Sequence, residues 1–266
     1  MNEPFQTSGT NADLPPRGQL SGSSGLTLIE LMVGMVAGAI LLSAAYSLMH
    51  IHSRQSYQTE RKIELRGQMT LTAKRIQRAI TMAGIGLNGS ATLLKNDAVG
   101  SDTLVIFMNE AEANSPLISD ANTSTPILIV QEPSLFLNAI YVAVFSDGIG
   151  EIRMITGQSG SVLHLDSPFS SPHATASSVA YPASLERYYS DQDSSHMVLE
   201  EDGEPRVVGR NLRNFQVSFK DRRGESTETA SEIRTVQFSF AGIFPSEAGA
   251  LNSVSFSSTA IPRNSL

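Results

Sequence analysis

One acidic residue, Glu30, stands alone inside an apolar segment, and its position calls for a chemical explanation. The 24 residues from Leu26 to Met49 hold no other charged side chain. A carboxylate in the middle of a bilayer costs about 2.5–3.5 kcal/mol on insertion scales, so we expect Glu30 to have a partner. Packed between helices, a carboxylate and a cationic amine offset part of each other's desolvation, which makes ion pairing the chemistry that Glu30 can supply.

A second group of acids follows a strand-like segment near residue 191. Asp191 and Asp193 precede a run of three acids, Glu200, Glu201 and Asp202. Carboxylates are the ligands that Ca²⁺ prefers, but this spacing lacks the glycine and the terminal glutamate of a standard calcium loop. A solvated acidic loop is therefore the favoured interpretation, calcium binding is the alternative, and we assign no metal site.

The residue types of common catalytic sites are present but scattered. The five histidines lie at positions 50, 52, 164, 173 and 196. His50 and His52 are two residues apart, so they point to different faces of a helix, whereas shared metal ligation favours a spacing of three or four. The chain has neither a G-x-S-x-G motif nor a P-loop, and without cysteine it has no disulfide and no Cys-based metal site. We predict a non-enzymatic protein without a cofactor.

Residues 84–89, GIGLNG, match the dinucleotide-binding pattern G-x-G-x-x-G literally. That function needs a strand before the glycines and a helix after them. Here a helical pattern precedes them and a polar turn follows, so we interpret the glycines as the end of a helix.

The elements that position these residues begin with one long helix. Residues 1–24 are rich in Gly, Ser and Pro and predict an unfolded leader. Residues 26–49 can span a hydrocarbon core of roughly 30 Å, and they form too long an apolar run for a secretory signal peptide. Farther along, small or apolar residues recur at helical spacing, at Leu65, Met69, Ala73, Ile76, Ile80 and Ala83. We predict one helix from about residue 26 to 83, apolar all round at first and then amphipathic, with its second half packed on a sheet.

Beyond residue 89 the sequence predicts strands and loops. The expected strands cover residues 102–108, 127–131, 139–145, 151–155, 162–166, 179–189, 197–200, 206–208, 215–219 and 235–240, with a further short one after Ser253. Residues 215–219 and 235–240 alternate between apolar and polar side chains, which is typical of half-buried antiparallel strands. The polar segment 109–126 is expected to be unstructured or to serve as a contact surface.

Gly25 and the following residues LTLIELMV resemble the class III signal of type IV pilins and of type II secretion pseudopilins. The resemblance implies that a prepilin peptidase cuts after Gly25 on the cytoplasmic face and methylates the new first residue, Leu26. It also implies that Glu30 pairs with the N-terminal amine of a neighbouring subunit. A mis-staggered subunit would leave both charges unpaired, so this pair would also fix the axial register.

Segments of the second half narrow the resemblance. HMVLEEDGEPRVVGRNLRNFQVSFKDRRG, IRTVQFSF and the terminal SSTAIPRN are similar to PilW-like minor pilins and their J-type pseudopilin relatives. This implies a structural subunit of a tip complex that primes pilus assembly. Its implied partners are other minor and major pilins, the inner-membrane assembly platform, membrane lipid and a tip adhesin. The net charge of −7 argues against nucleic acid as a partner.

The charge distribution conflicts with the implied topology. The leader carries one base, Arg17, whereas residues 54–78 hold seven bases against two acids. Counting positive charges alone would place the C-terminal side in the cytoplasm. The cleavage motif requires a cytoplasmic leader, so we expect a single-pass inner-membrane protein with a periplasmic domain, later part of an extracellular pilus.

The predicted organisation is an α+β, pilin-like chain with a mostly antiparallel sheet. It comprises a cleaved leader at 1–25, a transmembrane and assembly helix at 26–49, an amphipathic continuation at 50–84 and a β-rich periplasmic domain at 85–266. Two alternatives to a minor pilin stay open. One is a minor pseudopilin of a type II secretion system, and the other is a periplasmic binding module that uses the helix as an anchor.

Overall fold

The computed structural model describes residues 27–87, 93–98, 101–146, 149–245 and 250–263. The chain divides into two compact units, with the division between Ser56 and Tyr57 inside the long helix. The predicted leader and the cleavage site at Gly25 and Leu26 lie outside the described residues.

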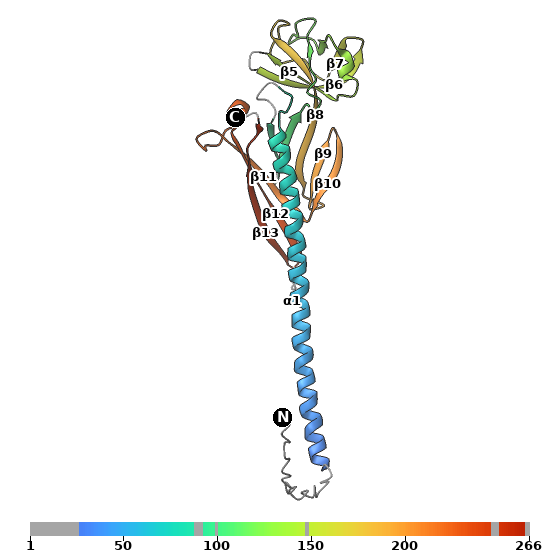
Figure 1. Ribbon diagram of the computed structural model, residues 1–266, viewed down its shortest axis with the longest axis vertical. Helices are drawn as coiled ribbons and strands as arrows, with labels where there is room; N and C mark the ends of the chain where they lie inside the picture. Colours follow the sequence, from blue (N-terminus) through green and yellow to red (C-terminus); the bar gives the residue numbers. More distant parts are fainter. Residues whose placement is uncertain (1–26, 88–92, 99–100, 147–148, 246–249, 264–266) are drawn as a thin grey trace, which may run out of the picture. The chain divides into compact units, whose positions relative to one another are not determined.

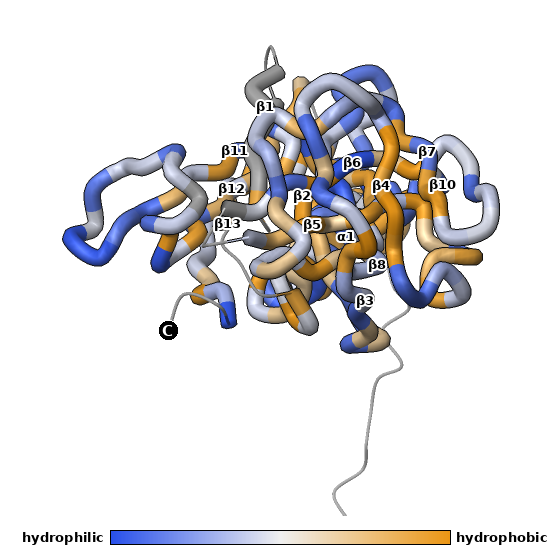
Figure 2. The backbone as a smooth tube through the Cα atoms, turned by 90° about the horizontal axis from the view of Figure 1, so that it is seen from above, coloured by the Kyte–Doolittle hydropathy of each residue, from blue (hydrophilic) through white to orange (hydrophobic). Residues whose placement is uncertain are grey.

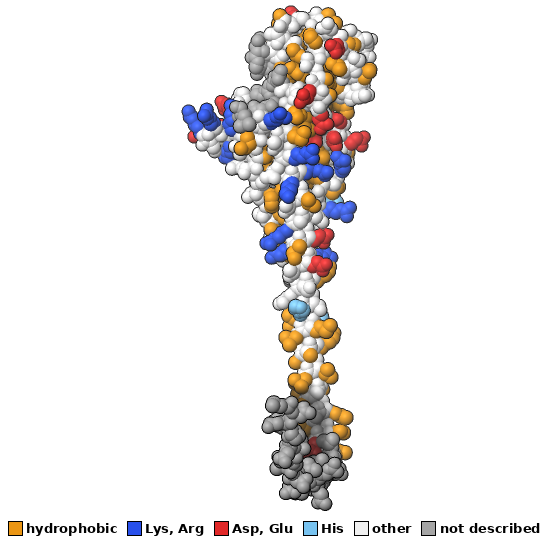
Figure 3. Space-filling view, viewed as in Figure 1, with side chains coloured by type: hydrophobic (Ala, Val, Ile, Leu, Met, Phe, Trp, Pro, Cys, Tyr) orange, Lys and Arg blue, Asp and Glu red, His pale blue; other side chains and the backbone are white. Residues whose placement is uncertain are grey.

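Helix α1 runs from Leu28 to Met82 and confirms the long helix that the sequence predicts (Figure 1). In the first unit its side chains are mostly exposed, including large apolar ones such as Leu42 and Met49. Hydrophobic side chains cover much of the visible face of this apolar segment in Figure 3. By length and composition, α1 contains a segment able to cross a membrane.

The second unit takes up the amphipathic half of α1. Each of the six residues that the helical spacing singles out, from Leu65 to Ala83, is at most 5% exposed. The nearby bases Arg66, Lys74 and Arg78 are exposed, as the pattern predicts. Thr72, also on the buried face, donates its hydroxyl to the carbonyl of Val208 at 3.0 Å, which satisfies a polar group inside the core. The apolar stripe of α1 is therefore the surface on which the strands pack.

The helix ends at glycines, as predicted. Gly84 and Gly86 have φ angles of 73° and 67°, a left-handed conformation that glycine adopts without steric cost. A Cβ atom on Gly86 would lie 2.3 Å from the carbonyl oxygen of Asn109, so glycine also permits close approach of the two backbones. The N–H of Gly84 donates to the carbonyl of Phe107 at 3.0 Å and joins the helix end to a strand.

The strands form two sheets in which every strand pairing is antiparallel, and the predicted α+β pilin-like fold class is confirmed (Figure 1). The ten-stranded sheet has the path β1-β2-β8-β5-β6-β7-β4, with β3 on β8 and with β9 between β8 and β10. The three-stranded sheet has the order β11-β12-β13. The strand bounds are β1 Leu93–Ala98, β2 Ser101–Met108, β3 Ser115–Pro116, β4 Ile127–Ile129, β5 Tyr141–Ser146, β6 Ile149–Ser159, β7 Val162–Leu165, β8 Ser178–Asp191, β9 His196–Glu201, β10 Glu204–Arg210, β11 Leu212–Lys220, β12 Thr235–Pro245 and β13 Leu251–Ala260.

Several features differ from the sequence prediction. The segment 109–126 is not unstructured, because its residues Leu117 and Ala121 are 4% and 3% exposed and bridge to Val130 and His173. These buried apolar side chains and the pairing of β3 (Ser115–Pro116) with β8 fix a segment whose composition is otherwise polar. Strand β1 and the short 3₁₀ helices η1 (Pro133–Phe136) and η2 (Ala230–Glu232) were not predicted, and β13 is ten residues long rather than short.

Separate apolar clusters fill the second unit. The largest joins α1 to β2, β8, β9 and the inner face of β11–β13, and contains Ile76, Tyr188 and Phe215. A second cluster lies among β4–β8 and contains Phe136, Val144 and Phe169. Figure 2 shows hydrophobic and hydrophilic stretches alternating along the tube. Strand β8 contributes to both clusters and links them, because it pairs with β2 and β9 over one part and with β5 over another.

Ile76→Ala should destabilise the second unit strongly. Ile76 is fully buried, so the substitution removes buried methyl groups and leaves a cavity that typically costs about 2–5 kcal/mol. Chemical denaturation of the full chain in detergent, followed by tyrosine fluorescence, measures this change. Leu71→Ala, on the same helix but at a side chain that is 70% exposed, is the matched control and should change the free energy of unfolding by less than about 0.5 kcal/mol.

Candidate functional site

Glu30, the residue that the sequence singles out, lies in the first turn of α1 and hydrogen-bonds to Thr27. The Thr27 N–H and hydroxyl both donate to Oε2 of Glu30, at 2.9 and 3.0 Å. In return, the Glu30 N–H donates to Oγ1 of Thr27 at 3.3 Å. This reciprocal pattern is a capping box, which satisfies backbone donors that the first turn of a helix leaves without partners.

The capping role was missed in reading the sequence, although the signal is present. Thr27-Leu28-Ile29-Glu30 is a T-x-x-E sequence directly before an apolar helix. A negative side chain in the first turn also interacts favourably with the helix dipole. Glu30 therefore has a local structural role in the single chain, in addition to any role in assembly.

The surroundings of Glu30 leave its carboxylate open to another molecule. The neighbouring apolar side chains Leu28, Ile29 and Leu31 are 75%, 72% and 49% exposed. Among the described residues, Glu30 forms no ion pair with a basic side chain. Oε2 accepts both Thr27 hydrogen bonds, and the described hydrogen bonds leave Oε1 as an acceptor for a further donor.

A second constellation, which sequence reasoning did not find, surrounds Glu151 on β6. Oε2 of Glu151 accepts from Arg153 and from the Ser170 N–H, both at 2.7 Å, and Oε1 accepts from the Ser171 N–H at 2.7 Å. His173 is 1% exposed, and its Nε2 lies 3.5 Å from Oε1. No local spacing could have signalled the cluster, because the strand and the loop that form it are about 20 residues apart.

Charge and burial set the protonation of this cluster. Burial alone would raise the pKa of the Glu151 carboxyl, but the N–H groups of Ser170 and Ser171 and the charge of Arg153 hold this pKa below its usual value. Burial lowers the pKa of His173, although the nearby Glu151 carboxylate opposes that shift. The cluster therefore holds the loop 166–173 through an ionised Glu151, beside a neutral, buried His173 whose ring nitrogens have no hydrogen-bond partner among the described residues. It lacks a nucleophile paired with a base, and we interpret it as structural.

The acidic residues near 191 do not converge on one point. Asp191 closes the turn between β8 and β9, where its carboxylate accepts from the Asp193 N–H and the Ser194 hydroxyl at 3.1 and 2.6 Å. Glu200 and Glu201 pair with Arg187 and Arg206, at 2.9 and 2.6 Å. Within the described ranges, no group of three His, Cys, Asp or Glu side chains is arranged to hold a metal ion.

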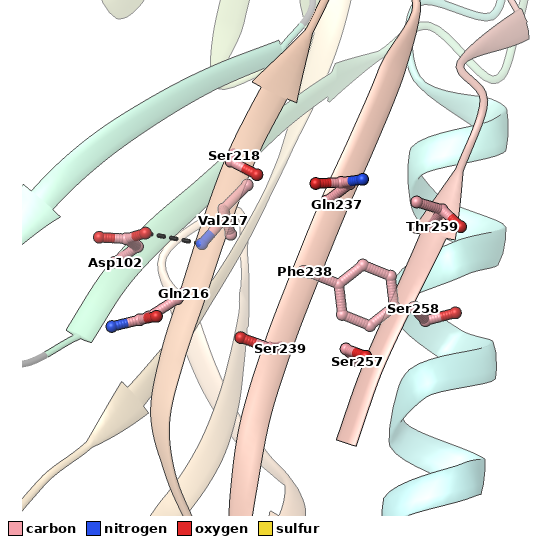
Figure 4. Close-up of a pocket in the computed structure, with 10 residues that line it drawn as sticks. All are labelled: Asp102, Gln216, Val217, Ser218, Gln237, Phe238, Ser239, Ser257, Ser258 and Thr259. Carbon is pink, nitrogen blue, oxygen red and sulfur yellow. Dashed lines mark hydrogen bonds between the residues drawn. The ribbon is translucent and has the colours of Figure 1, made fainter. Parts of the chain in front are cut away.

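A shallow polar groove of about 680 Å³ covers the outer face of β11–β13 (Figure 4). Its lining is mostly amide and hydroxyl side chains, as in Gln216, Gln237, Ser239 and Ser257. The one charged residue in it, Asp102, accepts a hydrogen bond from the Val217 N–H at 2.6 Å. The lining contains no histidine or cysteine, so it offers surface for contact but no acid–base pair for catalysis.

Comparison with known proteins identifies the N-terminal segment. Residues 20–46 match the family described as the prokaryotic N-terminal methylation motif, which is type IV prepilin-like. The motif supports a type IV pilin-like or pseudopilin protein and belongs to a structural family. It implies processing by a prepilin peptidase and association with other pilins, and with the apolar helix it is consistent with inner-membrane anchoring. The chain matches no curated protein and no solved structure.

Acidification should release the loop held by Glu151. The pKa values of both His173 and Glu151 lie below the ordinary 6.5 and 4.5 in the folded loop, so the open loop binds more protons. The loop must then lose stability as the pH falls, first below about 6.5 through His173 and further below about 4.5 through Glu151. Amide hydrogen exchange at Ser170 and Ser171, corrected for its intrinsic pH dependence, measures the opening.

Glu151→Gln tests the same loop at neutral pH. Hydrogen bonds to a charged group are worth about 1.5–3 kcal/mol, so these two amides should exchange at least about tenfold faster in the variant. Glu132→Gln, at an exposed position outside the cluster, is the control and should leave their exchange unchanged. Equal protection in the Glu151 variant and the natural chain would show that the carboxylate does not hold the loop.

Proposed function

We propose that this chain is a minor pilin of a type IV pilus, a PilW-like structural subunit that helps to prime filament assembly. The observation that carries the proposal is the methylation motif at residues 20–46, with Glu30 as the one acid in an otherwise apolar helical segment. The PilW-like assignment and the place in a tip complex rest on the sequence resemblance in the second half of the chain.

Processing of the chain follows from the motif. The prepilin peptidase removes residues 1–25 and methylates the amine of Leu26. Residues 26–49 form the membrane and assembly helix, residues 50–84 its amphipathic continuation, and residues 85–266 a periplasmic domain. Assembly then transfers the protein from the inner membrane, through contacts with the assembly platform and with other minor and major pilins, into the pilus or its tip. A tip adhesin is a further proposed partner.

Glu30 would then serve two consecutive roles. In the single chain its carboxylate caps α1 through Thr27. In the filament the same carboxylate would accept the methylated amine of a neighbouring Leu26. Removing one partner of a buried ion pair costs about 3–5 kcal/mol, because the other charge remains uncompensated. The pair therefore gives assembly a strong preference for one axial register.

Two alternative functions use the same features. The motif is shared with type II secretion pseudopilins, so the chain could be a minor pseudopilin of that machine, and the neighbouring genes would discriminate the two. The polar groove of Figure 4 favours the other alternative, a membrane-anchored periplasmic binding module. A simple anchor needs the cap that Glu30 forms but not its negative charge, which makes that charge the discriminating feature.

Mass spectrometry of the mature amino terminus tests the class directly. The protein isolated from its native host should begin at a methylated Leu26, with residues 1–25 absent. Deleting the host's prepilin peptidase should restore an uncleaved and unmethylated chain. A mature protein that still begins at Met1 while the peptidase is active would contradict the proposal.

Substitution of Glu30 tests assembly. Glu30→Gln keeps an oxygen that can accept from Thr27, and so retains the cap, but it removes the negative charge. We expect its incorporation into isolated filaments to fall at least about tenfold, since an uncompensated amine costs several kcal/mol. Glu30→Ala, which also loses the cap, should be at least as defective. Quantitative immunoblotting of filament and membrane fractions measures both variants.

The controls separate an assembly defect from a folding defect. Amide exchange at residues 28–31 in detergent should match the natural chain for Glu30→Gln, and the amount of the variant in the membrane should be normal. A Gln variant that enters filaments as efficiently as the natural chain would contradict the role of the charge, and absence of the natural chain itself from filaments would favour a simple anchor.

A further inference from the structure

The outer edge of β13 is a strand edge without the features that usually prevent pairing with another chain. Strand β13 is ten residues long and contains no charged residue and no proline. Its register with β12 is continuous from Val236↔Ala260 to Pro245↔Leu251. Natural sheets usually protect their edges with charges, prolines, bulges or short strands, because an open edge offers unpaired N–H and C=O groups.

The other strand edges in the described part of the second unit carry such protection. Strand β10 contains Glu204, Pro205 and Arg206, and its register shifts between Val207 and Gly209. Strand β11 also has a shifted register, and the Asp102 carboxylate accepts its Val217 N–H. The remaining edges are shorter: β3 has two residues including a proline, β4 has three residues, and β1 has six. Strand β13 is the exception.

A hydrogen bond identifies which residues of β13 face outward. The side chain of Gln77 on α1 donates to the backbone carbonyl of Thr259, at 3.3 Å. Backbone N–H and C=O groups alternate in direction along an antiparallel strand. Those of Ser253, Ser255 and Ser257 therefore point away from β12, as the carbonyl of Thr259 does. Gln77 contacts only the end of this edge. Among the described strands β13 pairs with β12 alone, so the three serines have no strand partner.

The side chains of β13 define what kind of strand would fit. Over residues 253–259 its exposed side chains, including Ser255 and Ser257, are small hydroxyls that do not block an approaching backbone, whereas Leu251 and Asn252 are exposed at its first end. They continue the uncharged amide and hydroxyl face shown in Figure 4. On the opposite face, Val254 and Phe256 are only partly buried, and Phe256 stacks on Phe240 with ring centroids 5.3 Å apart. A partner strand would therefore be uncharged, with small polar residues on one face and apolar residues on the other.

We propose that the outer edge of β13 accepts an extended segment of a different subunit of the same assembly, which adds a fourth strand to the β11–β13 sheet. This inference rests on the proposed function, because the assembly supplies the partner. Backbone hydrogen bonds provide the affinity in such strand addition, and alternate side chains provide the specificity.

A second copy of this chain is a less suitable partner. Strands β11–β13 run alongside α1 within the second unit (Figure 1). A two-fold axis perpendicular to the sheet, which pairs two β13 edges antiparallel, would turn the two α1 helices in opposite directions. In the proposed assembly, whose subunits all point in the same direction, that pairing cannot form.

Hydrogen exchange in D₂O tests the edge in the full mature chain. Filaments or tip complexes isolated from the native host are compared with the detergent-solubilised monomer. The outward amides of Ser253, Ser255 and Ser257 should exchange at least about tenfold more slowly in the assembly, because each gains a backbone acceptor. The amides of Val254 and Phe256, which already face β12, are internal controls and should be protected in both states. Equal exchange of the serine amides in both states would overturn the proposal.

Substitutions test the same edge in cells. Ser255→Pro removes an outward donor without removing a bond to β12, so incorporation into the assembly should fall at least about tenfold. Ser255→Ala is the matched control and should incorporate normally. Ser255→Lys places a charge on the edge and should reproduce the assembly defect of the proline variant. It provides the test if the proline variant fails to fold. Normal incorporation of folded Pro and Lys variants would overturn the proposal.

A cysteine at Ser257 identifies the partner. The natural chain contains no cysteine, so Ser257→Cys provides a single thiol for a short bifunctional cross-linker. A cross-linked product that joins this chain to a different subunit supports the proposal only if Ser255→Pro abolishes that product. A cross-linked product of two copies of this chain overturns the proposal. If the β13 variants assemble normally while Glu30→Gln still abolishes assembly, only the proposal for the β13 edge is rejected. A silent Glu30→Gln would instead reject the proposed function.

Discussion

The packing of the apolar stripe of α1 against two sheets is the interaction on which the second unit depends. Ile76 and Ile80 are fully buried in the cluster that also contains Leu104 and Phe215, from different sheets. The two sheets share no strand pairing, so the helix and the side chains around it hold them together. The approach is close: a Cβ atom on Gly242 of β12 would lie 2.7 Å from the sulfur of Met69. A larger residue there would have to displace the side chains of Met69 and Leu65, so the glycine lets β12 lie near the helix without that displacement.

The N-terminal part of α1 has the opposite character. Its apolar side chains have no partner within the described unit of the single chain, and its one acid is bonded only to the adjacent Thr27. A segment of this composition gains stability from lipid or from other helices rather than from its own domain. The same helix therefore stabilises the fold through one end and is available for anchoring and assembly through the other.

Polar and charged groups within the second unit mostly have local structural roles. Glu151 holds a loop, Asp191 closes a hairpin, and Arg187 and Arg206 neutralise neighbouring glutamates. The uncharged surfaces have no comparable local role. The polar face of β11–β13 and the open edge of β13 adjoin each other, and together they form a surface suited to another polypeptide.

The long helix, its buried residues, the glycines at its end and most of the strands can be predicted from the amino-acid sequence. These features follow from local periodicity and backbone preference, which are encoded by near neighbours. The isolation of Glu30 in an apolar run was equally visible, and so was its T-x-x-E cap, although the cap was not recognised. Folding was needed to reveal four other features: the division into two sheets, the length of β13, the burial of Leu117 and the placement of His173 beside Glu151. Each depends on contacts between residues distant in the chain, and neither composition nor spacing records which of the possible partners a strand or a buried side chain selects.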